Sequence, residues 1–216
     1  MSWLQRVQKQ FQEKRIARSI ARKSMIDAVR AGNLLRLAQR IEEEQIPGDV
    51  VECGVYRGGS AATIARVATH SRMNRTVWLF DSFQGMPPVT EADGTGAEDW
   101  VGALSYDPRK VEKLLRRTGS DLSRVRIVKG FFADTFPEVD IPQIALLNVD
   151  SDWYESVKIC FEKFYDAVAP GGFVSIDDYG AWPGCRLAVD EFFQKRGLTH
   201  KILPVDSTAS WFQKAG

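Results

Sequence analysis

The chain has 216 residues, of which 44% are hydrophobic and 26% charged, with a formal net charge of +1. This length fits one domain with a substantial core, and the near-neutral balance argues against a protein that binds nucleic acid through its overall charge. The three cysteines, Cys53, Cys160 and Cys185, are widely spaced and form no C-x-x-C motif, so we expect reduced thiols in a cytoplasmic protein. No apolar run is long enough to span a bilayer and the N-terminus lacks the apolar segment of a signal peptide, so no stable membrane insertion is expected.

The first 30 residues are basic and roughly helical in period. Leu4, Val7 and Phe11 share one face, and arginines and lysines cover the rest. Such a helix can lie on a membrane surface or bind an acidic partner, but we favour a solvated helix that packs on its own subunit or on a neighbouring one. With a second helix predicted at 33–45, residues 1–46 are expected to form a helical extension that serves as a lid or as a subunit contact in a homo-oligomer.

From Asp49 onward, strands are predicted to alternate with helices. Short runs of apolar and β-branched residues bounded by turn residues indicate buried strands, at 50–53, 76–80, 125–128, 144–149 and 173–176. Helices are predicted between them, at about 60–69, 108–117, 153–168 and 185–195. A closing pair of strands follows at 201–205 and 210–213. This alternation indicates an α/β fold with a doubly wound, mostly parallel sheet.

A long loop is predicted at residues 84–107, which are rich in glycine, proline and acidic residues. Loops of that length are usually functional or disordered. The sequence leaves open whether this loop forms a lid over a ligand.

Two pairs of aspartates end two consecutive predicted strands. Asp150 and Asp152 follow the strand at 144–149, and Asp177 and Asp178 follow the next one. In an open parallel sheet the carboxyl ends of neighbouring strands meet at the ligand crevice, where four carboxylates would repel one another unless a cation lies among them. Oxygen ligands suit Mg²⁺, Mn²⁺ or Ca²⁺. Aspartate is also a common cap and turn residue, but two such pairs favour the metal.

A glycine-rich turn joins the strand at 50–53 to the following helix. Its candidate cofactor-binding residues are Glu52, Gly54, Tyr56, Gly58 and Ser60. Glycines let the backbone approach a ligand closely, and the helix N-terminus can receive an anionic group. The spacing matches neither the dinucleotide fingerprint nor a P-loop. The turn alone is therefore a weak indication.

Asp81 strengthens it, because an acidic residue at the end of the second strand commonly accepts hydrogen bonds from ribose hydroxyls. A nucleoside cofactor without a pyrophosphate fits both features, and S-adenosylmethionine is one. Ser82, next to Asp81, is a further candidate for the cofactor site. Asp134, after the third strand, could contact the adenine or could equally cap a short turn.

Tyr154 and Lys158 fit the Y-x-x-x-K pair of short-chain dehydrogenases. With Asp81 as ribose ligand they make an NAD(P)-dependent oxidoreductase an alternative. Against it, Ser60 stands where that family's G-x-x-x-G-x-G turn has its last glycine. Nor would that chemistry require four aspartates.

Five segments between residues 48 and 195 together resemble the macrocin O-methyltransferase family: VVECGVYRGGS, LFDSFQGMP, KGFFADTFP, LLNVDSDWYES and GGFVSIDDYG. The resemblance implies an enzyme that uses S-adenosylmethionine and Mg²⁺ to methylate a sugar hydroxyl in natural-product biosynthesis. It implies a Rossmann-like methyltransferase domain at 47–216, whose seven-stranded, mostly parallel sheet ends in an antiparallel hairpin. It also implies metal ligation by Asp150, Asp177 and Asp178, with Asp152 as the general base.

The expected acceptor is a small molecule that offers a vicinal diol, such as a sugar or a glycosylated natural product. Chelation of two acceptor oxygens makes a hydroxyl more acidic, and Asp152 would remove its proton. A catechol chelates Mg²⁺ equally well, so a catechol-type O-methyltransferase stays an alternative. A third possibility is a non-catalytic module that binds S-adenosylmethionine without turnover.

Overall fold

A seven-stranded sheet in the order β3-β2-β1-β4-β5-β7-β6 forms the centre of the molecule, seen in a computed structural model that describes residue 20 and residues 24–215. Its strands are β1 (Asp49–Cys53), β2 (Val77–Asp81), β3 (Val125–Lys129), β4 (Ile144–Val149), β5 (Val168–Ile176), β6 (Leu203–Pro204) and β7 (Ser210–Gln213). The first five strands run parallel, and β7 lies antiparallel to both β5 and β6. The predicted mostly parallel sheet with a closing antiparallel hairpin is confirmed.

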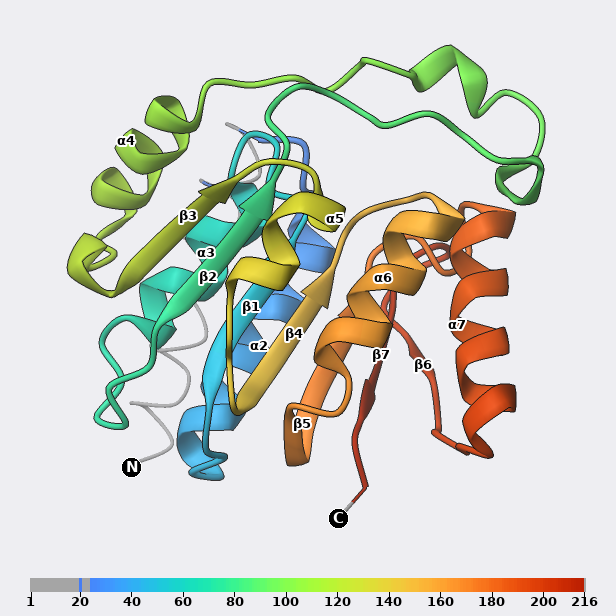
Figure 1. Cartoon of the computed structure of the whole chain (residues 1–216). Helices are drawn as coiled ribbons and strands as arrows, with labels where there is room; N and C mark the ends of the chain where they lie inside the picture. The colour runs from blue at the N-terminus through green and yellow to red at the C-terminus, as the bar shows by residue number, and fades with distance from the viewer. Residues whose placement is uncertain (1–19, 21–23, 216) are drawn as a thin grey trace.

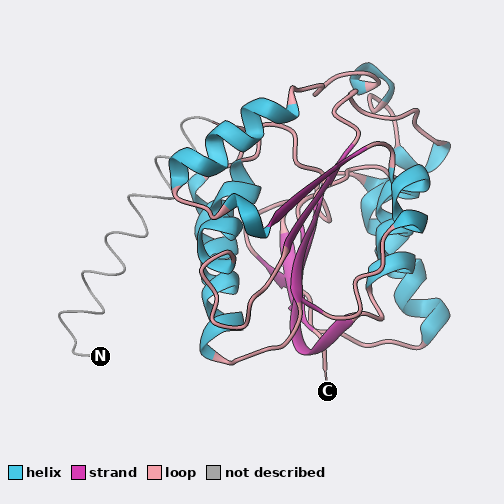
Figure 2. Cartoon of the chain, turned by 60° about the vertical axis from the view of Figure 1, so that its left-hand side comes forward, coloured by secondary structure: helices cyan, strands magenta, loops and turns pink. Residues whose placement is uncertain are grey.

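Helices cover both faces of this sheet, which Figure 2 shows nearly edge-on between two helical layers. They are α2 (Ala28–Glu43), α3 (Gly59–Ala68), α4 (Pro108–Thr118), α5 (Phe132–Thr135), α6 (Tyr154–Phe164) and α7 (Pro183–Arg196). One hydrophobic cluster joins α2, α3 and α4 to one face, and a second joins α6 and α7 to the other. The central strand β4 is buried along its whole length, which explains its continuous apolar sequence.

The strand register places the ends of β1, β4 and β5 side by side. Cys53 at the end of β1 pairs with Val149 at the end of β4, and Val149 pairs with Ile176 at the end of β5. The strand order reverses between β1 and β4, which is where open α/β sheets bind their ligands. Residues that directly follow β1, β4 and β5 are therefore neighbours at the carboxyl end of the sheet.

Several element boundaries differ from the sequence predictions. The helix predicted at 153–168 ends at Phe164, and the following strand begins at Val168 instead of residue 173. Pro170 and the glycines after it indicated a helix end, but they lie within β5, where Pro170 is exposed and the pairing with β4 has a register shift; proline is tolerated at such irregular positions. The strand predicted at 201–205 is only Leu203–Pro204.

Helix α2 begins at Ala28, five residues before the predicted start. Asp27 caps it, since its side chain accepts hydrogen bonds from the backbone amides of Val29 (2.6 Å) and Arg30 (2.9 Å). The predicted basic helix of the first 30 residues falls mostly outside the described residues. The lid or subunit-contact role of residues 1–46 and the homo-oligomer stay predictions. No helix in the described part of the chain is both long and apolar enough to cross a membrane.

Arg75 fastens the C-terminal end of α2 to the sheet. Its guanidinium is fully buried and donates hydrogen bonds to the carbonyl oxygens of Ile41 (3.0 Å), Ile46 (2.6 Å) and Gly48, and to the carboxylate of Glu42 (2.5 Å). These bonds give donors to carbonyl oxygens in the last turn of α2 and in the segment that joins it to β1. With its C-terminal end fixed in this way, α2 places its N-terminal end at the carboxyl end of the sheet, where Arg30 contacts Asp177.

We predict that Arg75→Met destabilises the protein by at least about 2 kcal/mol, because it leaves buried carbonyl oxygens without donors. Urea unfolding would measure the free energy of unfolding. The control Arg126→Met removes an exposed arginine and should change this free energy by no more than about 0.5 kcal/mol. Equal effects of the two substitutions would contradict the anchoring role of Arg75.

Candidate active site

A cavity of about 570 Å³ lies at the carboxyl end of the sheet. This volume is typical of a site for a small molecule or cofactor. The glycine turn after β1, the ends of β2, β4 and β5, and one side of α6 line it, together with Met86, Pro87, Pro88 and Leu104 from the loop at 84–107. Both aspartate pairs predicted from the sequence reach this cavity.

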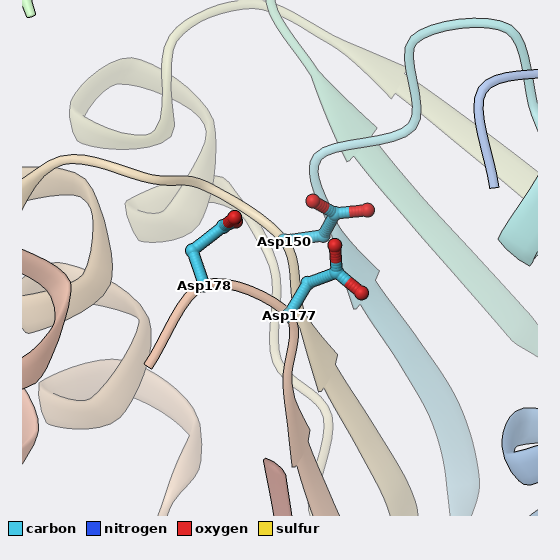
Figure 3. A group of neighbouring side chains, drawn as sticks. All are labelled: Asp150, Asp177 and Asp178. Carbon is cyan, nitrogen blue, oxygen red and sulfur yellow. The ribbon is translucent and has the colours of Figure 1, made fainter. Parts of the chain in front are cut away.

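Asp150, Asp177 and Asp178 come together as the sequence predicted. One carboxylate oxygen from each lies within 4.8 Å of the others, and Figure 3 shows the three side chains at the ends of β4 and β5. Two backbone hydrogen bonds extend the sheet into this group, from the Asp150 amide to Cys53 O (2.8 Å) and from the Asp177 amide to Val149 O (2.9 Å).

The three carboxylates fit a divalent cation. Oxygen donors from aspartate are the ligands that Mg²⁺, Mn²⁺ and Ca²⁺ prefer. The Oδ2 atom of Asp178 is buried and has no hydrogen-bond partner among the described residues, although buried polar atoms normally have one. Burial raises the pKa of Asp150 and of Asp178, and neighbouring carboxylates raise both further.

Asp152 is not one of the three, although it is only two residues from Asp150, and its carboxyl group interacts with that of Asp178. Its backbone has φ +55°, a left-handed conformation that redirects the chain just past the end of β4. The indole Nε1 of Trp182 donates a hydrogen bond to Asp152 Oδ1 (3.1 Å). Burial and the charge of Asp177 raise the pKa of Asp152 to about 6. The residue therefore faces the cavity as an oriented carboxyl group.

The glycine turn needs its first glycine for steric reasons. Gly54 has φ +92°, and a Cβ atom there would lie 1.6 Å from the backbone oxygen of Asp150. Asp81 braces the same turn, because its Oδ2 accepts hydrogen bonds from the amides of Val55 and Tyr56, both at 2.7 Å. Its Oδ1 accepts one from the amide of Phe83 (2.6 Å). Asp81 thus shapes the turn, and its contact with a ribose stays a prediction.

The other predicted cofactor residues divide between the cavity wall and positions behind it. Tyr56, Ser60 and Ser82 line the cavity, whereas Glu52 and Gly58 do not. Asp134 is exposed and lies outside the lining, and the N-cap of α5 is Phe131. The adjacent residues that do line the cavity after β3 are Phe131, Phe132 and Ala133.

Glu52 is buried directly behind the turn. Its Oε1 accepts a hydrogen bond from the side-chain amide of Asn148 (3.3 Å), and its Oε2 has no partner within the described part of the chain. Burial raises the pKa of Glu52 to about 8. A carboxyl group in this environment favours its neutral form.

Two residues of the site were missed by the sequence analysis. Arg30 at the start of α2 donates a hydrogen bond to Asp177 across 147 residues of sequence. Asp93 is buried in the loop at 84–107 and accepts hydrogen bonds from the amide of Tyr154 (2.6 Å) and from that of Thr90 (2.7 Å). Arg30 belongs to no local motif that would indicate its role. Asp93 forms a capping box with Thr90, but that motif does not indicate its contact with Tyr154.

The Y-x-x-x-K pair does not form a catalytic pair in the structure. The hydroxyl of Tyr154 donates a hydrogen bond to Glu191 on α7 (2.7 Å), and Tyr154 is not among the residues that line the cavity. Lys158 forms an ion pair with Glu155 (3.5 Å). This geometry does not support the oxidoreductase alternative.

Comparison with known proteins gives consistent results. The model of the macrocin-O-methyltransferase (TylF) family matches residues 4–214. The chain is 32% identical over 197 residues to demethyldecarbamoylnovobiocin O-methyltransferase of Streptomyces niveus, covering 88% of this chain and 75% of the relative. It is 34% identical over 197 residues to 8-demethyl-8-(2,3-dimethoxy-alpha-L-rhamnosyl)-tetracenomycin-C 4'-O-methyltransferase of Streptomyces olivaceus, with the same coverage.

Solved structures of O-methyltransferases also match this chain. The O-methyltransferase NovP matches with a TM-score of 0.77 and 31% identity, covering 90% of this chain and 83% of NovP. The calicheamicin methyltransferase CalS11 matches with a TM-score of 0.68 and 21% identity, covering 85% and 77% of the two chains.

The fold and these relatives define an S-adenosylmethionine-dependent O-methyltransferase. More narrowly, the chain belongs to the macrocin-O-methyltransferase family. The resemblance, the enzyme class and the Rossmann-like fold expected from the sequence are thereby confirmed.

We predict that Glu52→Gln increasingly stabilises the cofactor-free protein as the pH rises. A carboxyl whose pKa moves from 4.5 unfolded to about 8 folded makes wild-type folding less favourable between those pH values, and the effect levels off above about 8. Glutamine lacks the titrating proton, so the difference in unfolding free energy between variant and wild type should grow across this range. Urea unfolding from pH 5 to 8.5 would measure it.

The exposed residue Glu112 on α4 offers a matched control. Glu112→Gln should leave the pH dependence of unfolding close to that of the wild type. A difference for Glu52→Gln that stays constant or shrinks with rising pH would contradict the buried, raised-pKa description of Glu52.

Proposed function

We propose that this enzyme methylates a hydroxyl group of a sugar, free or attached to a natural product, with the help of a divalent cation. One observation carries the proposal: the oxygens of Asp150, Asp177 and Asp178 lie within 4.8 Å of one another on the cavity that the glycine turn also lines. A methyl donor at the turn and an acceptor at the aspartates would then share one cavity.

Relatives support the sugar acceptor. The Streptomyces olivaceus enzyme is named for a rhamnosyl-tetracenomycin substrate, and a Micromonospora griseorubida relative, 32% identical over 205 residues, is named mycinamicin III 3''-O-methyltransferase. Neighbouring hydroxyls of a sugar can present two oxygens to one cation, which suits a site of three carboxylates with room for further ligands. The cavity lining from the loop at 84–107 is largely apolar, so it can contact a non-sugar portion of the acceptor.

Each part of the chemistry has a candidate residue. S-adenosylmethionine, when bound, supplies an electrophilic methyl group. A divalent cation held by Asp150, Asp177 and Asp178 would make an acceptor hydroxyl more acidic and hold it in place. The acceptor oxygen would form a bond to the methyl carbon as the carbon–sulfur bond breaks, which leaves the electron pair on sulfur in S-adenosylhomocysteine, and Asp152 would take the acceptor's proton.

Asp152 is the proposed base because of its geometry. The indole N–H of Trp182 donates a hydrogen bond to Oδ1 (3.1 Å) and so fixes the orientation of a carboxylate that lines the cavity. Trp182 packs edge-on against the buried ring of Trp153 (centroids 4.9 Å apart), so the indole that orients the carboxylate is itself held. Preorganised orientation of this kind is what a general base requires.

We predict that EDTA abolishes methyl transfer and that Mg²⁺ or Mn²⁺ restores it. Asp150→Ala and Asp177→Ala should lose activity together with cation binding, whereas the exposed control Asp140→Ala should retain both. Transfer of labelled methyl from S-adenosylmethionine to a panel of glycosides and catechols would measure this. Full turnover after verified metal removal would contradict the cation role, and turnover of catechols alone would contradict the sugar acceptor.

We predict that Asp152→Asn lowers kcat by roughly two to four orders of magnitude, the usual contribution of a positioned base. Asparagine keeps the size of the side chain and readily adopts a left-handed backbone, so the fold, the affinity for S-adenosylmethionine and the affinity for Mn²⁺ should persist. Steady-state kinetics with calorimetry would separate these quantities. A kcat within a few-fold of wild type would show that another group takes the proton, and loss of Mn²⁺ binding would make Asp152 a ligand.

A further inference from the structure

Arg30 reaches into the acidic group from the first turn of α2. Its Nη1 donates to Asp177 Oδ2, its Nε to Asp206 Oδ2 (2.8 Å), and its Nη2 to the hydroxyl of Thr208. The three partners come from the turn after β5 and from the turn between β6 and β7. One guanidinium therefore joins the start of α2 to two turns at the carboxyl end of the sheet.

The contacts with Asp206 and Thr208 form a fixed anchor. Asp206 Oδ1 accepts hydrogen bonds from the amides of Thr208 (2.8 Å) and Ala209 (2.7 Å), which leaves Oδ2 for Arg30. Asp206 is thus held by its own turn. The contact with Asp177 differs, because Asp177 also belongs to the group of three candidate cation ligands.

Arg30 is the basic side chain best placed to balance that group. Three basic residues in the described part of the chain line the cavity, namely Arg30, Arg57 and Lys158. The guanidinium of Arg57 lies over the ring of Tyr56 (5.1 Å), and Lys158 pairs with Glu155 (3.5 Å). Of the three, Arg30 forms an ion pair with a candidate ligand.

We infer that Arg30 is a positioning residue that holds Asp177 in the cation-free enzyme and competes with the divalent cation for it. The inference rests on the cation role proposed above. A positive charge against Asp177 opposes the arrival of a second one, so the cation must share Asp177 with Arg30 or displace it. Because Nε and Nη2 stay on Asp206 and Thr208, the guanidinium can release Asp177 without freeing α2.

This competition would take place close to a segment before α2 that also lines the cavity. Met25 and Ile26 line the cavity just before the Asp27 cap of α2, and Arg30 lies one turn beyond that cap. Ile26 lies close to Gly59 at the start of α3, beside the glycine turn.

The test is the affinity of the full chain for Mn²⁺, measured by calorimetry and by electron paramagnetic resonance of free Mn²⁺. Arg30→Gln should bind Mn²⁺ about tenfold or more tightly than wild type, because a repelling charge is removed. Arg30→Lys keeps the charge but cannot bridge three partners, and its affinity should fall between the two. The control Arg36→Gln removes an exposed arginine of the same helix and should leave the affinity unchanged within about twofold.

Thermal unfolding supplies a readout that needs no activity. Without metal, Arg30→Gln should melt below wild type because Asp177 loses its counter-charge, and saturating Mn²⁺ should raise its melting temperature more than that of wild type. Equal Mn²⁺ affinity in wild type, Arg30→Gln and Arg30→Lys would overturn the inference and leave the cation role standing. Weaker binding by both variants would overturn it too, by making Arg30 a support of the site. If neither the wild type nor any variant binds Mn²⁺, the proposed cation role itself is wrong, and the inference is wrong with it.

Discussion

The site depends on the register of β1, β4 and β5, which places the carboxyl ends of these three strands side by side. Two backbone hydrogen bonds, from the Asp150 amide to Cys53 O and from the Asp177 amide to Val149 O, carry the sheet one residue beyond its strands. They set carboxylates from two strands side by side next to the glycine turn. The same closeness makes Gly54 obligatory, because any Cβ atom there would meet the backbone of Asp150. A shift of β4 by one residue would turn the side chains of that strand to the other face of the sheet.

Concentrating negative charge at one edge of a sheet has an electrostatic cost that the surrounding residues offset. Like charges held this close raise one another's pKa unless a cation is present. Arg30 supplies one positive charge, anchored by Asp206 and Thr208, and a divalent cation would supply more. Glu52 lies just behind the turn as a buried carboxyl that favours its neutral form. Arg75, at the far end of α2, fixes the helix that brings Arg30 to the site.

Local patterns were sufficient to predict the strands, the order of elements and the convergence of the two aspartate pairs, because parallel strands necessarily end at a common edge. They were insufficient wherever the deciding contact is distant in sequence. Arg30 meets Asp177 and Asp93 meets Tyr154 only through the fold. Pro170 suggested a helix end because its tolerance in β5 depends on a register shift in the pairing of β5 with β4. Asp134 shares a segment with the cavity wall but faces outward, which residue type alone does not reveal.

The central claim is that Asp150, Asp177 and Asp178 together bind a divalent cation beside the methyl-donor site. A crystal structure of the protein with S-adenosylhomocysteine and Mn²⁺, with anomalous diffraction collected at the manganese edge, would test it most directly. The account predicts an anomalous peak at about 2.2 Å from one oxygen of each of these carboxylates, with Asp152 outside the coordination shell. No peak in the cavity at saturating Mn²⁺, or a peak coordinated elsewhere, would contradict it.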